Sequence, residues 1–299
     1  MKKNAKAVIA DALLIAMMIL PLTACIVLKI LFSPASEGIS VTGALIYFTI
    51  PMPIMDLPIT EAQVNSWAVI LTILAICLFL TRRMKVKPTS KRQILAEFIV
   101  EKAEGLVKSN MGERFLSFAP FIAAILGLSA LSSLSSLLGI YPPTSDINII
   151  AGWAILVFAL ITYYKLKGGI GNYLKGYTEP VVFFTPINII SEVATPVSMT
   201  FRHFGNVLSG SVISILVATA LQGLTSLVLG WLPGALGDIP FLQVGIPAVL
   251  SLYFDIFSGC LQAFIFAMLT MLYVANGFPE EAYEKRKAKK AARRKRAKA

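Results

Sequence analysis

The stretch that decides the fold is PINIISEVATPVSMTFRHFGNVLSGSVISILVATALQGL, from Pro186 to Leu224. It is an apolar run with a helical pattern, and Arg202 lies in its middle with no acidic residue within two helical turns. A charged side chain at the centre of a bilayer costs about 2.5–3.5 kcal/mol on the insertion scale. We therefore expect Arg202 to face a protein interior, a water-filled cavity or a charged partner, with an internal salt bridge as the structural alternative.

Polar residues repeat around Arg202 at helical spacing. Residues three, four and seven apart share one face of a helix, which selects Thr195, Ser198, Asn206 and Ser209. Serine and threonine can bond to carbonyls of their own helix, so Arg202 and Asn206 carry most of the argument. The pattern predicts one polar stripe along an otherwise apolar helix.

The composition is that of a polytopic membrane protein. Hydrophobic residues make up 57% of the chain and charged residues 14%, with a mean hydropathy of +0.76. Soluble proteins carry about 25% charged residues, and a membrane-crossing helix needs about 20 apolar ones. We predict an all-α polytopic membrane protein with six such segments, at residues 7–32, 64–81, 116–139, 148–164, 187–224 and 244–275.

Basic residues predict the orientation of these segments. All but two of the 27 Lys and Arg residues lie before the first segment, between the second and third, after the fourth, or after the last. The exceptions are Arg202 and Lys29, and a lysine near a helix end can snorkel. Because positive charge marks the cytoplasmic side, we expect both termini in the cytoplasm.

The first segment leaves two alternatives. A basic start followed by an apolar run is typical of a signal peptide, and the string from Leu22 to Cys25 is similar to a lipoprotein processing site. The apolar run continues beyond Cys25 as IVLKILF. We therefore expect a retained helix, because the whole run is long enough to span the membrane.

Cysteine and histidine usage does not suggest a metal site, a disulfide or a cofactor. Cys25, Cys77 and Cys260 lie in apolar runs without paired spacing, as inert buried thiols do. The single histidine, His203, lies off the polar stripe. We expect it to pack against another helix and not to relay protons.

Three further segments carry expectations. Residues 88–112 combine apolar and charged residues at helical spacing, which predicts an amphipathic helix on the cytoplasmic membrane surface, facing lipid or a partner. KGGIGNYLKG, at 167–176, is interpreted as a cytoplasmic turn and not a nucleotide site. A serine face in the third segment predicts close helix packing in preference to an ion path; it comprises Ser129, Ser132, Ser133 and Ser136.

The fifth segment is too long for a simple crossing. Its 38 residues would reach roughly 57 Å as a helix, nearly twice the hydrocarbon thickness of about 30 Å. The last segment is also long, and Pro196 can bend the fifth. Joined by GWLPGALGDIPF, the two segments are predicted to form a long, strongly tilted C-terminal hairpin.

The last segment carries its own polar stripe, with Asp255, Ser258 and Gln262 at helical spacing after Ser251. An acid inside a membrane indicates function. Two polar routes follow from the topology. One joins Glu192, Thr195 and Ser198 on the cytoplasmic side of Arg202, and the other joins Asn206, Ser209, Gln262 and Asp255 beyond it. Neither route crosses the membrane alone.

These residues carry a family resemblance. PVSMTFRHFGNVLSG, followed by DIFSGCLQAFIFAMLTMLYV, resembles the last two helices of subunit a of F-type ATP synthases. PPTSDIN and LKGYTEPVVFFTPINIISE are similar to other parts of that family. The resemblance covers about 60–277 as one membrane domain. It leaves out residues 1–59, an extra apolar helix with an external loop, and the basic cytoplasmic tail 278–299.

The resemblance implies a non-catalytic stator subunit in the inner membrane of a bacterial cell. It would offer two offset half-channels for H⁺ or Na⁺ to a rotating ring of c subunits, beside peripheral b subunits and membrane lipid. Arg202 is then the essential arginine, Asn206 and Gln262 are its polar neighbours, and Asp255 serves the outer half-channel. Two departures from the family stand out: Ser211 replaces an acid of some members, and Thr195 replaces a common basic residue.

Two other classes stay open. A stand-alone secondary transporter would use Arg202 and Asp255 as a substrate or proton pair, although no inverted repeat is visible between the halves of the sequence. A purely structural anchor would leave both polar stripes unexplained. The run EKRKAKKAARRKRAKA is interpreted as a tail attracted to anionic lipid, and no nucleic-acid partner is expected.

Overall fold

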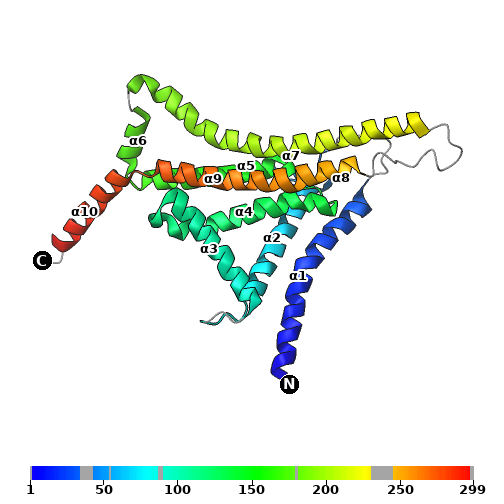
Figure 1. The fold of residues 1–299 in the computed structure, drawn as a ribbon. Helices are drawn as coiled ribbons and strands as arrows, with labels where there is room; N and C mark the ends of the chain where they lie inside the picture. The colour runs from blue at the N-terminus through cyan, green and yellow to red at the C-terminus, as the bar shows by residue number, and fades with distance from the viewer. Residues whose placement is uncertain are drawn as a thin grey trace.

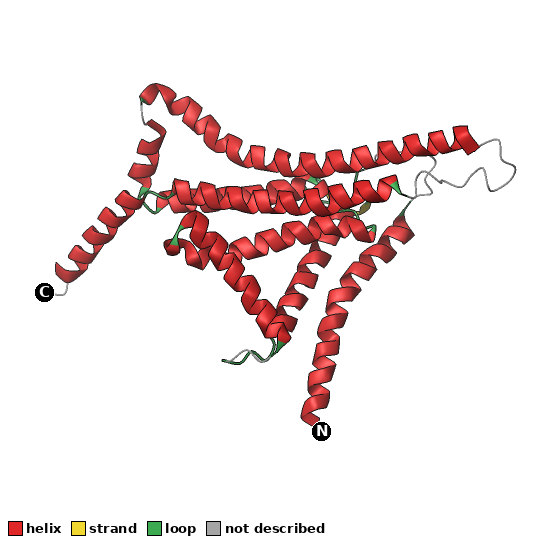
Figure 2. Ribbon diagram, in the orientation of Figure 1, coloured by secondary structure: helices red, strands yellow, loops and turns green. Residues whose placement is uncertain are grey.

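The computed structural model describes residues 2–33, 43–53, 55–86, 90–178, 181–229 and 245–296 (Figure 1). Parts of three predicted features lie outside these residues: the loop 33–63, the connection 225–243 and the end of the basic tail. The described chain is almost entirely helical (Figure 2). The all-α prediction is therefore confirmed.

Six helical segments are long and apolar enough to cross a membrane, as predicted. They are Ala7–Phe32, Glu61–Thr81, Glu113–Leu138, Ile147–Leu166, Val182–Val228 and Ile246–Gly277. The longest exceeds its prediction at both ends. As the single helix α7 (Thr185–Leu229), it runs through Pro196 without ending and curves along its length (Figure 1).

The other described elements make up these spans or connect and flank them. Their bounds are α1 Lys2–Phe32, β1 Ile46–Ile50, β2 Leu57–Thr60, α2 Glu61–Thr81, α3 Lys91–Met111, η1 Glu113–Phe118, α4 Ala119–Leu134, η2 Ser135–Leu138, η3 Pro143–Ser145, α5 Ile147–Leu166, α6 Ile170–Thr178, η4 Val182–Phe184, α8 Ile246–Ser251, the π-helical η7 Leu252–Ser258, α9 Gly259–Gly277 and α10 Glu280–Arg296.

Side-chain caps fix where three of the helices begin. Thr60 caps α2 in a capping box with Gln63, Ser90 caps α3 by accepting from the backbone of Gln93, and Asp146 caps α5. Such caps satisfy backbone N–H groups that have no partner within the helix.

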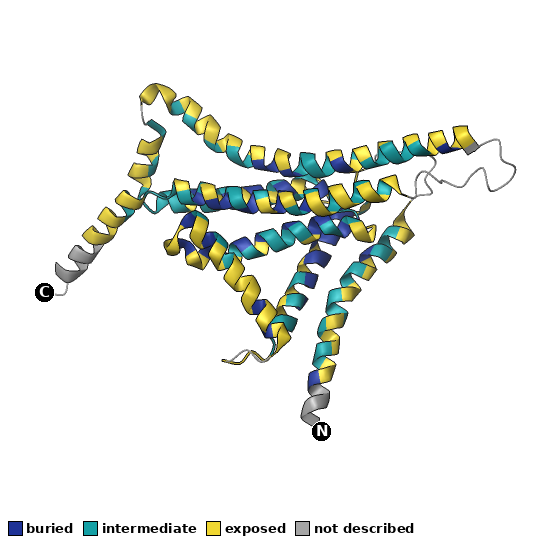
Figure 3. Ribbon diagram, in the orientation of Figure 1, coloured by how far each residue is buried: buried dark blue, intermediate teal, exposed yellow. Residues whose placement is uncertain are grey.

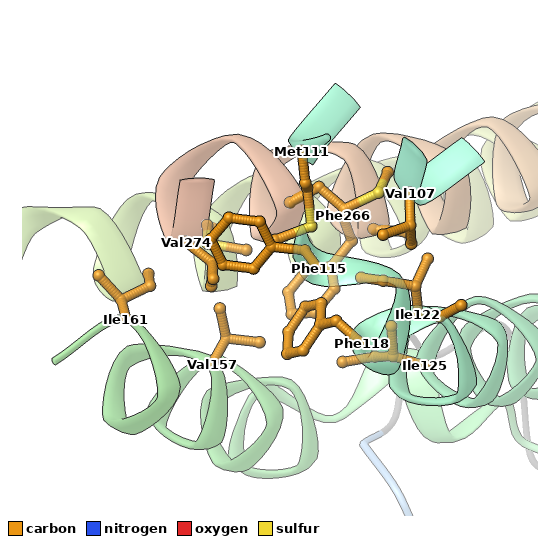
Figure 4. Packing of buried hydrophobic residues seen from close by; sticks show 14 of the residues in the cluster. Val107, Met111, Phe115, Phe118, Ile122, Ile125, Val157, Ile161, Phe266 and Val274 are labelled. Atoms are coloured by element: carbon orange, nitrogen blue, oxygen red, sulfur yellow. The ribbon is translucent and has the colours of Figure 1, made fainter. Parts of the chain in front are cut away.

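The helices form two sets. α4, α5, α7 and α9 run side by side, while α1 and α2 cross them at a steep angle (Figure 1). The core lies between α3, α4, α5 and α9 and contains Phe118, Ile122, Val157 and Phe266 (Figure 4). This packing holds the α4, α5 and α9 surfaces on which α7 rests.

Helix α1 packs along α2 and is held there by ion pairs, a hydrogen bond and apolar packing. Asp11 pairs with Arg82 at 2.9 Å and with Arg92 at 3.3 Å, and Thr72 donates to the carbonyl of Met18 at 3.2 Å. Cys25 is buried in a small cluster with residues of α2. The thiol of Cys25 is therefore buried as predicted, whereas Cys77 is exposed and Cys260 is only partly buried, so the prediction of buried thiols was wrong for these two.

Several elements differ from the predictions. The segment interpreted as a turn at 167–176 contains α6, a short helix that follows a turn at Gly169, whose φ is +104°. The basic tail is helical as α10 as far as Arg296. The last span is interrupted by η7, and the antiparallel hairpin of β1 and β2 has no predicted counterpart. These elements are short or polar, so a search for long apolar runs does not detect them.

Candidate functional site

Arg202 lies on the uncovered side of α7. The residue is exposed, as are Ser198 and Ser209 on the same stripe. No ion pair or hydrogen bond joins its guanidinium to another residue within the described part of the chain. The internal salt bridge considered as an alternative is therefore not formed there, and Arg202 is accessible to another molecule.

The opposite face of α7 is buried. His203 is completely enclosed, with its Nε2 3.4 Å from the hydroxyl of Ser129 and its ring centroid 5.6 Å from Phe266 and 6.2 Å from Trp153. His203 thus packs against α4, α5 and α9. The two residues at the centre of the segment have opposite environments, because neighbouring positions on a helix point about 100° apart.

The two predicted polar stripes meet between α7 and η7. The amide Nδ2 of Asn206 donates to the hydroxyl of Ser258 at 2.7 Å. One turn further along α7, a Cβ on Gly210 would lie 2.9 Å from the ring of Phe254. A glycine at this position lets the helices approach closely enough for the bond between Asn206 and Ser258.

Asp255 lies in the π-helical turn η7, where it accepts a hydrogen bond from the hydroxyl of Ser251. Single π-helical turns inside α-helices are frequently found at functional sites. The wider turn also changes which side chains share a face beyond it. Gln262 follows in α9 and is buried, so it is less accessible than the predicted stripe suggested.

A cavity of about 230 Å³ adjoins Asp255, and we call it the Asp255 cavity. Helices α4, α7 and η7 and the turn around η3 form its walls. The polar lining residues are Ser133, Ser136, Tyr141, Ser145, Ser211 and Asp255.

The predicted serine face contributes to this cavity as well as to packing. A Cβ on Gly259 would lie 2.8 Å from Cβ of Ser133, which confirms the expected close approach of another helix. Ser133 and Ser136 nevertheless line the cavity. The serine face therefore lines a polar cavity in addition to packing against another helix, and the prediction named only the packing.

A second cavity, of about 460 Å³, adjoins Glu192 at the opposite end of the site, and we call it the Glu192 cavity. Glu192 accepts from the ammonium of Lys165 at 2.9 Å and from the hydroxyl of Tyr173 at 3.2 Å. Tyr173 and Tyr177 lie with their hydroxyl oxygens 2.5 Å apart. Thr195 also lines the cavity, so one end of the predicted route has a polar enclosure.

Burial affects the tyrosines of this cavity. Both residues belong to α6, outside the spans, and desolvation raises the pKa of Tyr173 and of Tyr177 above the usual value for tyrosine. Both hydroxyls therefore stay protonated at neutral pH and can donate hydrogen bonds. The Glu192 cavity thus combines one ion pair with neutral donors.

Arg202 lies between the two cavities and lines neither. Along α7, the nearest lining residue of the Glu192 cavity is Thr195, seven residues before Arg202, and that of the Asp255 cavity is Val207, five residues after it. These separations correspond to about 10.5 Å and about 7.5 Å at 1.5 Å per residue. The site therefore consists of two separate polar cavities with an exposed guanidinium between them.

Some residues of these cavities were not singled out from the sequence. Lys165 was counted among the basic residues that set the topology, Tyr173 lay in the segment interpreted as a turn, and Tyr177 follows that segment directly. The close position of Lys165 to Glu192 depends on the packing of α5 on α7. The sequence nevertheless contained a signal for these residues. Lys165 ends an apolar span, and the segment that follows it combines polar residues with Tyr173 and Tyr177.

The fold and site define a class: a polytopic membrane protein with two separate polar cavities along a long helical hairpin and an exposed arginine between them. Residues 64–275 match the family described as ATP synthase A chain. The chain belongs to that family, subunit a of ATP synthase.

Individual relatives support the same family assignment. The chain is 32% identical over 235 residues to ATP synthase subunit a of Desulforamulus reducens, covering 77% of this chain and 84% of the relative. It is 34% identical over 209 residues to that of Alkalihalophilus pseudofirmus, covering 66% and 82%. It is 33% identical over 236 residues to ATP synthase subunit a of Priestia megaterium, covering 74% of this chain and 93% of the relative.

Family membership decides between the classes considered from sequence. The chain is the non-catalytic stator subunit of the membrane sector of an ATP synthase complex, and a multi-pass membrane protein. The stand-alone transporter is not favoured.

Proposed function

We propose that the Asp255 cavity and the Glu192 cavity are the two half-channels through which H⁺ or Na⁺ reaches and leaves the c-ring, and that Arg202 faces the ring carboxylate. The observation that carries this proposal is the position of Arg202, exposed between two cavities and lining neither. Because Arg202 separates these two cavities along α7, an ion in this proposal crosses by leaving one cavity on the ring and entering the other.

The electrostatics favour an arginine at this point. A carboxylate in a low-dielectric site stays charged only when a nearby opposite charge compensates it. Arginine is always protonated and presents several donors, so Arg202 attracts each ring carboxylate as that group loses its ion. The membrane potential contributes about 2.3 kcal/mol per elementary charge per 100 mV to the movement.

The polar residues then divide between the two half-channels. With both termini in the cytoplasm of a bacterium, the Asp255 cavity opens outward and the Glu192 cavity inward. Asp255 exchanges ions with the outer solution, while Asn206, Ser209 and Gln262 form the polar surface beside Arg202. Glu192, Thr195 and Ser198 take the equivalent positions on the inner side.

The partner surfaces follow from uncovered apolar area. Only 6% of the residues in the most apolar window of the α7 span are buried within the chain, and Figure 3 shows α7 mainly in the exposed and intermediate colours. Phe201 and Val197, next to Arg202, are 59% and 48% exposed. We assign this surface to the c-ring and the lipid around it.

Helix α3 is a candidate contact for the peripheral b subunits or the membrane surface. Its apolar residues Ile94, Phe98 and Ile99 are exposed, beside basic and acidic side chains. An amphipathic helix with an uncovered apolar face needs lipid or a partner to bury it.

The test is substitution of Arg202 by alanine in the intact complex. We expect Arg202→Ala to abolish proton-driven ATP synthesis while the complex still assembles with its c-ring, because the ring carboxylate loses its compensating charge. Lys91→Ala, which removes an exposed positive charge at the start of α3, is the matched control. Near-normal synthesis by the Arg202→Ala complex would refute the proposal.

A further inference from the structure

A group of buried, unpartnered oxygen atoms lies beside the Asp255 cavity. Glu61, the first residue of α2, is 2% exposed, and its Oε1 has no hydrogen-bond partner. No ion pair within the described residues includes its carboxylate. Lys29, the basic residue near the end of α1, donates to the carbonyl of Gly139 at 2.6 Å.

Two further oxygens share this property. Asn65, one turn along α2, is 1% exposed and its Oδ1 is unpartnered, as is the buried hydroxyl of Tyr47 in β1. The backbone N–H of Glu61 donates to the carbonyl of Leu45 at 2.7 Å, which brings β1 against the start of α2. Burial, followed by the charge of Glu61, raises the pKa of Tyr47 to about 12, so its hydroxyl stays protonated.

This group adjoins the Asp255 cavity through one residue. The Nδ2 of Asn65 donates to the carbonyl of Tyr141 at 2.8 Å, and Tyr141 lines the cavity together with Asp255. The oxygens therefore lie behind the cavity wall, at the end of the bundle where β1, β2 and η3 meet α2.

A buried carboxylate without a partner is unfavourable, because transfer of an ionised group out of water costs several kcal/mol unless a proton or cation compensates it. Amide and hydroxyl oxygens around a carboxylate are ligands for small hard cations. A bound monovalent cation would satisfy these oxygens and neutralise Glu61.

We propose that Glu61, with Tyr47 and Asn65, is a binding site for the translocated monovalent cation at the entrance of the outer half-channel. For H⁺ the site is the carboxyl itself, which gains a proton from the outer solution and releases it toward Asp255. For Na⁺ the oxygens act as ligands. This inference rests on the proposed function, since it takes the Asp255 cavity as the outer half-channel.

The experiment uses the whole ATP synthase in liposomes at a fixed membrane potential. ATP synthesis is measured while the ion concentration is varied separately on the outer and inner sides, once with protons alone and once with Na⁺ at constant pH. For the ion that drives synthesis, we expect Glu61→Gln to raise the half-saturating outer concentration by about tenfold, which for protons is about one pH unit. The dependence on the inner concentration stays unchanged, which a purely structural defect would not produce.

The control is Glu281→Gln, which neutralises a carboxylate on α10 whose side chain is 92% exposed and should leave both dependences as in the unmodified complex. A half-saturating outer concentration for Glu61→Gln within about twofold of that of the unmodified complex would overturn the inference.

If the Glu61→Gln complex cannot be recovered, Tyr47→Phe, which deletes one unpartnered hydroxyl, is tested by the same measurement. A shift of about threefold or more in the half-saturating outer concentration supports the site, and a smaller one overturns it. If the Arg202→Ala complex does not synthesise ATP and the Glu61→Gln complex keeps its half-saturating outer concentration, the Glu61 site alone is rejected. If the Arg202→Ala complex synthesises ATP, the proposed function is rejected.

Discussion

At the scale of single residues, charge and burial separate neighbours in the sequence. Arg202 is exposed without a partner in the described chain, while the adjacent His203 is enclosed by aromatic rings. Lys165 and Glu192 form a partly buried pair across two helices. Each arrangement assigns a different role to a polar group: contact with a partner, packing, or the wall of a cavity.

The Lys165–Glu192 pair gives a prediction about stability. Removing one partner leaves a charged group buried and unpaired, so Lys165→Met should destabilise the purified complex by about 1–3 kcal/mol. Adding Glu192→Gln should recover part of this loss, with a coupling energy of about 0.5–3 kcal/mol. Thermal unfolding of the four variants of the cycle measures the coupling, and strictly additive effects would contradict the pairing.

At the scale of elements, the hairpin of α7 with the α8–η7–α9 segment depends on close approaches at glycine. Gly210 allows α7 to reach the ring of Phe254, and Gly259 allows α9 to reach Ser133 of α4. The first approach supports the bond between Asn206 and Ser258. The second lies on the wall of the Asp255 cavity.

Gly210→Ala should therefore impair ion translocation. The added Cβ would lie 2.9 Å from Phe254, and overpacking of this kind costs about 1–3 kcal/mol and moves the helices apart. We expect a several-fold lower rate of proton uptake by reconstituted complexes, because Asn206 and Ser258 separate. Gly223→Ala, on the same helix where nothing lies within 4 Å, should be close to normal; equal effects of the two substitutions would exclude this explanation.

At the scale of the whole molecule, the cavities lie toward opposite ends of the bundle. The Asp255 cavity adjoins η3, near β2 and the start of α2, while the Glu192 cavity adjoins α6 and the end of α9. α10 follows α9 at that second end and is held by Arg114, which pairs with Glu280 and Glu284. The proposed topology places the β-hairpin outside and α10 in the cytoplasm.

Labelling with a membrane-impermeant maleimide tests this topology. In a cysteine-free background, Met55→Cys should react only from the outer side, and Lys285→Cys only from the cytoplasmic side, since the two side chains are 79% and 82% exposed. The measurement is mass shift in intact cells and in inverted vesicles. Reaction of both positions from the same side would contradict the proposed orientation.

The amino-acid sequence by itself determined the six spans, their apolar faces, the two polar stripes and the family. Hydrophobic length and charge placement are local properties, and the membrane acts on each segment in the same way. For this reason α7 and its arginine could be predicted in position and in character. The orientation and the roles of Glu192, Asn206 and Asp255 remain predictions that experiments on the complex must test.

Only the tertiary structure decided which polar groups share a cavity. Lys165 meets Glu192 across a separation of 27 residues, and Ser133 of α4 and Ser136 of η2 line the cavity of Asp255 from more than a hundred residues earlier. The π-helical turn and the buried oxygens of Glu61 and Asn65 are equally absent from any sequence period. The physical reason is that a cavity forms where several helix surfaces fail to fill the space between them, so its lining depends on how all of them pack.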